Sequence, residues 1–355
     1  MKILKLELEN IRNFQKLRLD FDDSLTIIYG GNAEGKTNLL EAIYFLNLTK
    51  YPRKIKEREV LLKGEETGRI KGIFRDDKEQ ELEVEFILGR EKIGKINKSK
   101  AKIKDVLGQA LSIFFTAENL KMIDAPEERR RFLNILLSLL DRKYFFNLLE
   151  YKQALKRRNK TLTLIGLKKS QGLELDFWDQ KIATLGSSIV SHRNIIISKI
   201  NKLLEDSPMF FKKSPLRLIY NAKDLSEELF LKELKKREKK DVALGQTTFG
   251  PHRDIIKLEA NNLDLEIYGS RGEKRAAVIE LKKTEAELLK KEKGVIPILL
   301  LDDVFSELDK ENRDNVLGLV GGQQTIITIT NPNYLKEVTQ EARVYKIEKG
   351  EIKKQ

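Results

Sequence analysis

The sequence contains no cysteine and only two histidines, His192 and His252. The lack of cysteine excludes a disulfide framework, a zinc–thiolate site and a thiol nucleophile, and two histidines are too few for a metal cage of histidines alone. Runs of eighteen or more apolar residues are also missing, so no membrane-spanning helix is predicted. The first ten residues lack the apolar block of a secretory signal, and we expect a cytoplasmic location.

Charge is abundant. Charged residues make up 35% of the chain and hydrophobic residues 40%, which is typical of a folded protein with a highly charged surface. The formal net charge of +13 favours a polyanionic partner such as nucleic acid, because each neutralised phosphate releases condensed counterions. Lysine and glutamate enrichment without cysteine is also typical of heat-adapted proteins, so charge alone leaves both interpretations open.

The spacing of apolar residues predicts an α/β sheet that is split by a helical insertion. The first hundred residues contain short β-compatible segments and one helix, residues from about Glu118 show helical periodicity, and the last third returns to α/β. The expected strands are Lys2–Leu8, Leu17–Phe21, Leu25–Tyr29, Arg69–Phe74, Glu81–Leu88, Ile296–Leu301, Thr325–Thr330 and Val344–Ile347. The expected helices are Thr37–Leu48, Phe132–Leu140, Tyr144–Leu155, Ile182–Leu204, Leu225–Lys240 and one from about Lys274.

A glycine-rich turn connects the strand Leu25–Tyr29 to the helix Thr37–Leu48, and its sequence fits the pattern G-x-x-x-x-G-K-[ST] of a phosphate loop. The glycines let successive N–H groups point inward as an anion nest, and the helix N-terminus adds partial positive charge. We expect Lys36 to reach the β- and γ-phosphates of ATP and the Thr37 hydroxyl to bind Mg²⁺. The residues expected to contact the nucleotide are Gly30, Gly31, Asn32, Ala33, Glu34, Gly35, Lys36, Thr37 and Asn38.

A second motif is the apolar strand that ends in Asp302 and Asp303. Ligands of open α/β sheets gather at the carboxyl ends of strands, so both acids should lie beside the phosphate loop. Asp302 would hold Mg²⁺, directly or through water, opposite Thr37, and Asp303 would orient or deprotonate the attacking water. The alternative is a strand that ends in a solvated acidic turn. Together the two motifs predict a nucleotide hydrolase without naming its superfamily.

Ser270 stands just before the helix that starts near Lys274, and Glu273 follows three residues later. This spacing is most often a capping box, although a serine hydroxyl and free N–H groups at a helix start equally suit a phosphate. With the other motifs, in this order along the chain, it resembles the RecF family of ABC-type ATPases. The stretches that carry the resemblance are Leu6–Phe14, Gly35–Ile43, Pro126–Leu133, Gly250–Asp254, Ser270–Gly272 with Arg275, and Ser306–Asp309 as the D-loop.

The resemblance implies an ABC-type P-loop ATPase head, with an α/β lobe I over residues 1–117 and 295–355 and a mainly helical lobe II over residues 118–294. It further implies slow, switch-like ATP hydrolysis and binding of double-stranded, gapped or junction DNA by an ATP-induced homodimer. RecO and RecR are the implied partners in loading RecA, and no membrane partner is expected.

Within that dimer, each γ-phosphate is implied to touch Lys36 of one copy and Ser270 of the other, with Gly272 close by. Arg12 resembles a residue that contacts the nucleotide, and Thr328–Asn331 should contain the switch-loop equivalent. Several positions depart from the family pattern. Ala33 replaces a common glycine, which is tolerable if its φ is negative, and the others are Asn134, Ile255 and Glu273–Lys274.

Basic residues on two expected helices are the candidates for contacts with DNA phosphates, and a solvated helix face is the alternative for each. They are Lys156, Arg157, Arg158, Lys160, Lys235, Lys236, Arg237, Lys239 and Lys240. Two other functions remain open. A Rad50- or SMC-like tethering head would need a long coiled coil between the phosphate loop and Ser270. An ABC transporter motor would need a histidine after Thr325–Thr330.

Overall fold

The computed structural model describes residues 1–21, 24–52, 55, 57–170, 172–211, 214–308, 310–318, 322–337, 342–348 and 350–354. The chain forms two compact units. Unit 1 comprises Met1–Lys121 and Leu281–Gln355, and unit 2 comprises Met122–Glu280. The second boundary between the units lies within a single helix, α8 (Arg271–Lys293). The expected lobe bounds, after residues 117 and 294, stay a prediction.

The first sheet of unit 1 is antiparallel throughout and has the strand order β2-β1-β4-β5-β6-β7. Buried and more exposed residues alternate along the whole length of β4. The outward face carries cross-strand ion pairs, such as Lys71 with Glu83 at 2.9 Å. The strands are β1 (Lys2–Ile11), β2 (Phe14–Asp20), β4 (Gly68–Arg75), β5 (Glu81–Leu88), β6 (Ile93–Ile96) and β7 (Ser99–Ala101).

The second sheet of unit 1 has the order β15-β14-β3-β13-β12-β8, and all its pairs except β14–β15 are parallel. Its central strands β12 and β13 are buried at every residue, which is typical of parallel strands covered on both faces. The strands are β3 (Leu25–Tyr29), β8 (Ser112–Thr116), β12 (Ile298–Asp302), β13 (Thr325–Ile329), β14 (Arg343–Glu348) and β15 (Glu351–Lys354).

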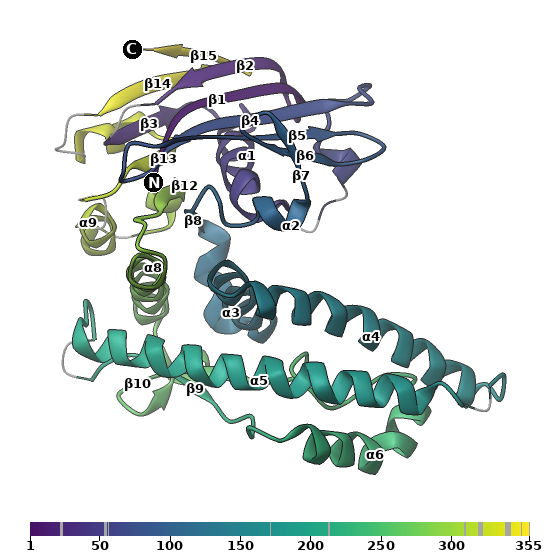
Figure 1. Cartoon of the computed structure of the whole chain (residues 1–355). Helices are drawn as coiled ribbons and strands as arrows, with labels where there is room; N and C mark the ends of the chain where they lie inside the picture. Colours follow the sequence, from purple (N-terminus) through teal and green to yellow (C-terminus); the bar gives the residue numbers. More distant parts are fainter. Residues whose placement is uncertain are drawn as a thin grey trace. The chain divides into compact units, whose positions relative to one another are not determined.

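Helix α1 (Lys36–Leu48) packs between the two sheets and contacts β4 and β5 of one and β8, β12 and β13 of the other (Figure 1). Its side chains join one apolar core with both sheets. The other short elements of this part are α2 (Ile103–Val106), α9 (Lys310–Gly318) and the 3-10 turns Glu57–Val60, Ala117–Asp124, Val304–Glu307 and Pro332–Glu337. Because β3 and β12 are parallel, their carboxyl ends meet at one edge of the sheet, where α1 begins.

Unit 2 is mainly helical. The long helices α4 (Arg142–Gly166) and α5 (Leu175–Asp206) lie side by side, and α6 (Glu227–Leu244) packs against α5 (Figure 1). Buried charges tie the three helices together. Arg158 of α4 is fully buried and lies 2.6 Å from both Asp179 of α5 and Asp241 of α6. The remaining elements are α3 (Pro126–Leu140), β9 (Arg217–Tyr220), β10 (Ile256–Ala260), β11 (Leu263–Asp264) and α7 (Leu265–Tyr268).

Every expected strand and helix coincides with or overlaps an observed element. The short strands β6 to β11 and β15 were not anticipated, because two to five residues give too little periodicity to recognise. Across the described part of the chain, none of the helices has both the length and the apolar character needed to traverse a bilayer.

Candidate functional site

The phosphate loop bends sharply before α1. Gly35 has φ 110° and immediately precedes the helix, and no side chain in the described structure caps the helix start. The Lys36 side chain, which is only 6% exposed, folds back over the loop. Its Nζ donates hydrogen bonds to the carbonyl oxygens of Gly30 at 2.8 Å and Gly31 at 2.6 Å. The ammonium group therefore lies inside the curve of the loop, where the expected phosphate contacts lie.

Ala33 adopts the left-handed conformation, with φ 65°. Alanine was expected to be tolerated here if its φ were negative, and the structure does not meet that condition. A Cβ in this region is strained, at a cost of about 1–2 kcal/mol, and the loop holds Ala33 there because the chain must turn between Asn32 and Glu34.

Burial lowers the pKa of Lys36, and the nearby carboxylates of Asp303, Asp302 and Glu34 partly offset that effect. The lysine thus carries its charge in a poorly solvated position next to acids. A triphosphate placed there would gain a cation that water screens only weakly.

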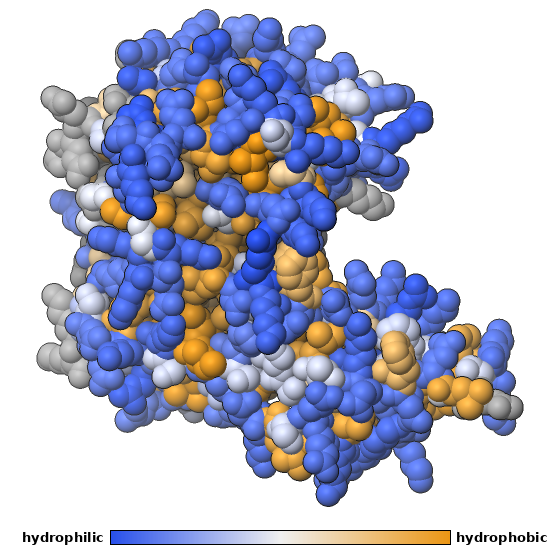
Figure 2. Space-filling view, viewed as in Figure 1, coloured by the Kyte–Doolittle hydropathy of each residue, from blue (hydrophilic) through white to orange (hydrophobic). Residues whose placement is uncertain are grey.

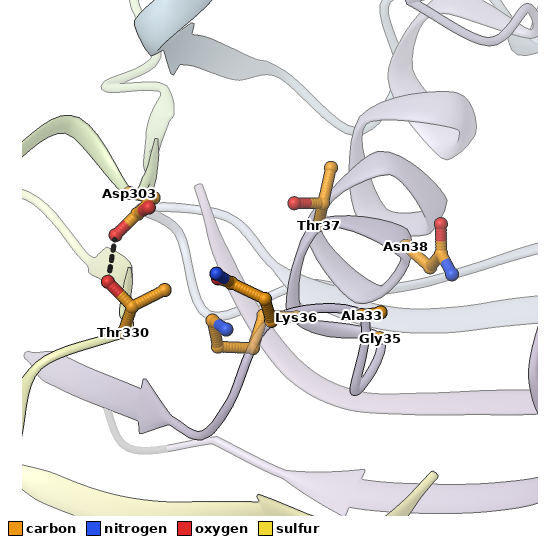
Figure 3. A pocket seen from close by; sticks show the side chains of 8 residues that line it. Ala33, Gly35, Lys36, Thr37, Asn38, Asp303 and Thr330 are labelled. Carbon is orange, nitrogen blue, oxygen red and sulfur yellow. Dashed lines mark hydrogen bonds between the residues drawn. The ribbon is translucent and has the colours of Figure 1, made fainter. Parts of the chain in front are cut away.

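The two acids at the end of β12 lie beside the loop, as the sequence predicts. The Thr37 hydroxyl lies 3.0 and 2.9 Å from the two carboxylate oxygens of Asp302, and Thr328 Oγ1 donates to Asp302 Oδ1 at 2.8 Å. Asp303 has φ 48°, and its carboxylate accepts a hydrogen bond from Thr330 Oγ1 at 3.1 Å. Figure 3 shows this Asp303–Thr330 pair facing the first turn of α1 across the pocket.

An open pocket of about 250 Å³ lies between the phosphate loop and the Asp303–Thr330 pair. It is lined by Asn32, Ala33, Gly35, Lys36, Thr37, Asn38, Asp303 and Thr330. Of these, only Thr330 is absent from the expected site residues, although it lies in the predicted switch stretch Thr328–Asn331. Its signal in the sequence was its place directly after the strand that pairs with β3 and β12.

Thr37 and Asp302 fit a magnesium site. Hydroxyl and carboxylate oxygens are the hard ligands that Mg²⁺ prefers, and Mg²⁺ commonly takes its remaining ligands from phosphates and water. The described residues include no cluster of three or more acidic or histidine side chains that could bind a metal ion without other ligands.

Arg12 does not line this pocket. Its Nη1 donates to the carbonyl oxygen of Glu59 at 2.9 Å, its Nη2 lies 3.8 Å from a carboxylate oxygen of Glu41, and its guanidinium lies over the ring of Tyr51. Glu41 follows Thr37 by one turn of α1. The guanidinium therefore lies beside the second turn of α1, and contact with a nucleotide stays a prediction.

Ser270 forms a complete capping box with Glu273. The Glu273 N–H donates to Ser270 Oγ at 3.2 Å, and the Ser270 N–H donates to Glu273 Oε2 at 2.8 Å. These hydrogen bonds lower the pKa of the Glu273 carboxyl. Ser270 is exposed, and a Cβ added at Gly272 would meet no described atom within 4 Å. Ser270 and Gly272 belong to unit 2, whereas the phosphate loop belongs to unit 1.

Several residues of the family stretches have structural roles. His252 is hydrogen-bonded between the Tyr151 hydroxyl at 2.7 Å and the Thr247 carbonyl oxygen at 3.0 Å, and burial lowers its pKa. Arg129 is buried and lies 2.6 Å from Glu266. Asp254, the last residue of the stretch Gly250–Asp254, accepts hydrogen bonds from Arg193 and Tyr220.

The DNA candidates differ in exposure. The expectation that Arg158 contacts DNA is corrected by the structure. Arg158 is fully buried between Asp179 and Asp241 and has no surface to offer a phosphate. Lys235 is exposed but pairs with Asp176 and Asp179, and Arg237 pairs with Glu233 at 3.2 Å. The other exposed candidates are Lys156, Arg157, Lys160, Lys236, Lys239 and Lys240. The face shown in Figure 2 is mostly hydrophilic.

In the expected D-loop, the Ser306 hydroxyl donates to the Asp303 carbonyl oxygen at 2.8 Å, while Asp309 lies outside the described residues.

One residue of the site was missed by the sequence reasoning. Asn13, in the turn between β1 and β2, hydrogen-bonds the phosphate loop. Only its membership in the stretch Leu6–Phe14 pointed to it.

Comparison with known proteins agrees with this geometry. The family model described as the RecF/RecN/SMC N-terminal domain matches residues 2–353. The chain is 36% identical over 360 residues to the DNA replication and repair protein RecF of Lachnoclostridium phytofermentans, with 100% of both chains covered.

Solved structures extend the likeness to the fold. The recombination mediator protein RecF with ATPγS, in the RecFOR pathway, has a TM-score of 0.91 at 32% identity, covering 99% of this chain and 97% of that chain. The same mediator with ATP has a TM-score of 0.90 at 32% identity, covering 100% and 97%. The predicted ATPase head, α/β with a helical insertion, is therefore confirmed. This chain belongs to the RecF family.

Proposed function

We propose that this chain is an ATP-dependent DNA-binding protein of recombinational and replication-gap repair that assists RecA loading with RecO and RecR. The observation that carries the proposal is the convergence of Lys36, Thr37, Asp302 and Asp303 at one sheet edge, with the Thr37 hydroxyl 2.9 Å from Asp302. Relatives that match along their full length, including a RecF solved with ATP, support the same biology.

The residues of unit 1 divide the work on ATP. Lys36 exchanges the carbonyl oxygens of Gly30 and Gly31 for the β- and γ-phosphates, which are stronger acceptors because they are charged. Thr37 and Asp302 would hold Mg²⁺, which neutralises charge on the phosphates. Asp303, fixed by the Thr330 hydroxyl, orients or deprotonates the attacking water.

Ser270 acts from a second copy of the chain. In this proposal two copies close head to tail, so that Ser270 of one copy reaches the γ-phosphate held by Lys36 of the other. One copy binds ATP by itself, and the closed dimer binds it more tightly because Ser270 of the other copy adds a contact. ATP therefore shifts the dimerisation equilibrium toward the closed state, and hydrolysis releases the two copies. Slow turnover suits a closed dimer that is the DNA-binding form.

DNA binds through its phosphates in this proposal. The exposed lysines of α4 and α6 have flexible cationic side chains that neutralise phosphates without reading bases. The affinity for duplex DNA should therefore fall steeply with salt. Arg158 should make no contact with DNA, since its guanidinium is enclosed by the carboxylates of Asp179 and Asp241.

The two other functions are less well supported. A Rad50- or SMC-like tether requires a long coiled coil, whereas α4 and α5 contain 25 and 32 residues, which at about 1.5 Å per residue reach no more than about 50 Å. A transporter motor predicts a histidine after β13, where this chain has Thr330.

The decisive experiment measures mass in solution with and without ATP, each with and without duplex DNA. We expect a monomer without ATP and a dimer with it, and DNA should be retained chiefly by the dimer. A chain that stays monomeric at high concentration with ATP and duplex present would contradict the dimer model. DNA binding that does not change between low and high salt would contradict the phosphate contacts.

A further inference from the structure

Asn13 connects the first sheet of unit 1 to the phosphate loop. Its Nδ2 donates a hydrogen bond to the Glu34 carbonyl oxygen at 2.8 Å, and its Oδ1 accepts one from Asn38 Nδ2 at 2.9 Å. The amide and the carbonyl of its side chain thus face partners of opposite type, which fixes the orientation of the carboxamide. The two partners flank Gly35, Lys36 and Thr37, so a single side chain spans the part of the loop that faces the phosphates.

The loop leaves room for this side chain at Gly35. A Cβ at Gly35 would lie 2.7 Å from Asn13 Oδ1 and would overlap the rest of the carboxamide. Gly35 also has φ 110°, a conformation that side chains disfavour. Glycine at this position therefore serves both the turn of the loop and the close approach of Asn13.

The backbone around Asn13 is itself held. The Arg12 N–H donates to the Val60 carbonyl oxygen at 2.7 Å, and a Cβ at Gly350, between β14 and β15, would lie 2.9 Å from the Asn13 carbonyl oxygen. All these groups belong to unit 1. Asn13 is thus fixed by neighbours that are independent of the loop, and it can impose a position on the loop.

We propose that Asn13 is a positioning residue for ATP, which holds the segment from Glu34 to Asn38 in the curvature that directs its N–H groups at the phosphates. It acts through the loop and not on the reacting atoms. The inference rests on the proposed ATP site, and it predicts that the loop of an Asn13 variant still has all its phosphate ligands but no longer holds them in place.

The test compares Asn13→Ala with a matched control, Asn97→Ala. Asn97 lies between β6 and β7 of the same unit, and its side chain accepts one backbone hydrogen bond, from Glu83 at 2.9 Å. ATP affinity and unfolding temperature are measured for both, with ATP and Mg²⁺. Loss of two net hydrogen bonds predicts about tenfold weaker ATP binding for Asn13→Ala, and unchanged binding for Asn97→Ala.

A double-mutant cycle separates positioning from general destabilisation. Asn38→Ala removes one of the two bonds together with the expected contact of Asn38 with the nucleotide, so the coupling between the two substitutions is the informative quantity. We expect the double variant to lose less ATP affinity than the sum of the two single losses. Fully additive effects would show that the pair does not act as a unit and would overturn the proposal. Equal ATP affinity of Asn13→Ala and the unmodified chain would also overturn it.

The outcomes distinguish this inference from the proposed function. If the unmodified chain binds no ATP, the proposed function fails. If the unmodified chain binds ATP and Asn13→Ala binds it equally well, this inference fails alone. Should Asn13→Ala not fold, Asn13→Ser replaces it, because a hydroxyl keeps a polar group in the turn but is too short to reach both partners. The same loss of affinity is expected, and unchanged affinity overturns the inference.

Discussion

Helices α1 and α8 both begin at motifs that suit a phosphate, but their first turns are satisfied in different ways. Helix α1 follows Gly35, with φ 110°, and within the described structure it has no side-chain cap. Helix α8 follows Ser270, which exchanges two hydrogen bonds with Glu273. The N-terminal donors of α1 thus lack a side-chain partner, whereas two donors at the start of α8 already have one.

In the proposed dimer, the two helix starts have separate tasks. Orphan N–H groups at a helix N-terminus favour an anion, so α1 can bind phosphates with residues of unit 1 alone. Ser270 uses one acceptor position for the cap, but its O–H proton remains a donor. The start of α8 can therefore add one hydrogen bond to a phosphate that is already bound elsewhere. This suits a residue that recognises the nucleotide only after another copy has bound it.

The largest effect should come from removing the charge at α1. Lys36→Ala eliminates two charge-assisted hydrogen bonds to phosphate, and we expect ATP affinity to fall at least about 100-fold. Titration calorimetry with Mg²⁺–ATP measures this directly, and the unfolding temperature checks that the variant is folded. Affinity like that of the unmodified chain would mean that the loop does not bind phosphates.

The next effect concerns turnover and not binding. Asp303→Asn removes the base but retains an acceptor for Thr330, so kcat should fall about 100-fold while ATP affinity stays within a few-fold. Thr330→Val, which only frees the carboxylate from its hydrogen bond, should lower kcat less. Steady-state ATPase rates at saturating ATP test both, and an unchanged rate for Asp303→Asn would assign the water to another residue.

A third prediction separates the two roles of Ser270. Ser270→Ala removes the cap and the hydroxyl, whereas Glu273→Ala breaks the same capping box and keeps the hydroxyl. Each should cost about 1 kcal/mol of stability, and neither should change ATP affinity. Only Ser270→Ala should prevent the ATP-induced dimer, as measured by light scattering. Equal loss of the dimer in both variants would show that Ser270 acts merely as a cap.

Short motifs made the phosphate loop and the acid pair predictable. Each lies within one strand–turn segment, and the parallel sheet brings Thr37 to Asp302 once β3 and β12 are recognised. The fold class followed in the same way from the periodicity of long segments. The capping box of Ser270 involves residues only three positions apart, so it was predictable from the sequence as well.

Contacts between distant segments were not predictable in this way. Arg157 and Arg158 are neighbours of the same type, yet one is exposed and the other is buried. Arg158 is the one that turns inward, where Asp179 on α5 and Asp241 on α6 pair with it. Asn13 likewise meets Glu34 only through the packing of the β1–β2 turn against the loop. The left-handed φ of Ala33 is imposed by the loop and opposes the preference of the residue.

The smallest effect is expected for glycine-to-alanine substitution at the start of α8. It gives the sharpest contrast between the two helices, because the same substitution can be made at the start of α1. Gly272→Ala meets no described atom within 4 Å and replaces glycine in the first turn of α8. The free energy of unfolding should stay equal or rise by up to about 1 kcal/mol. ATP affinity should not change, whereas the ATP-induced dimer should weaken because a methyl group now stands where a phosphate approaches. Gly35→Ala should behave in the opposite way, losing stability and ATP affinity together, since its Cβ strikes Asn13 and its φ is 110°. Thermal unfolding, calorimetry and light scattering on the two variants test the contrast. A Gly272→Ala chain that dimerises normally would show that no phosphate approaches this turn.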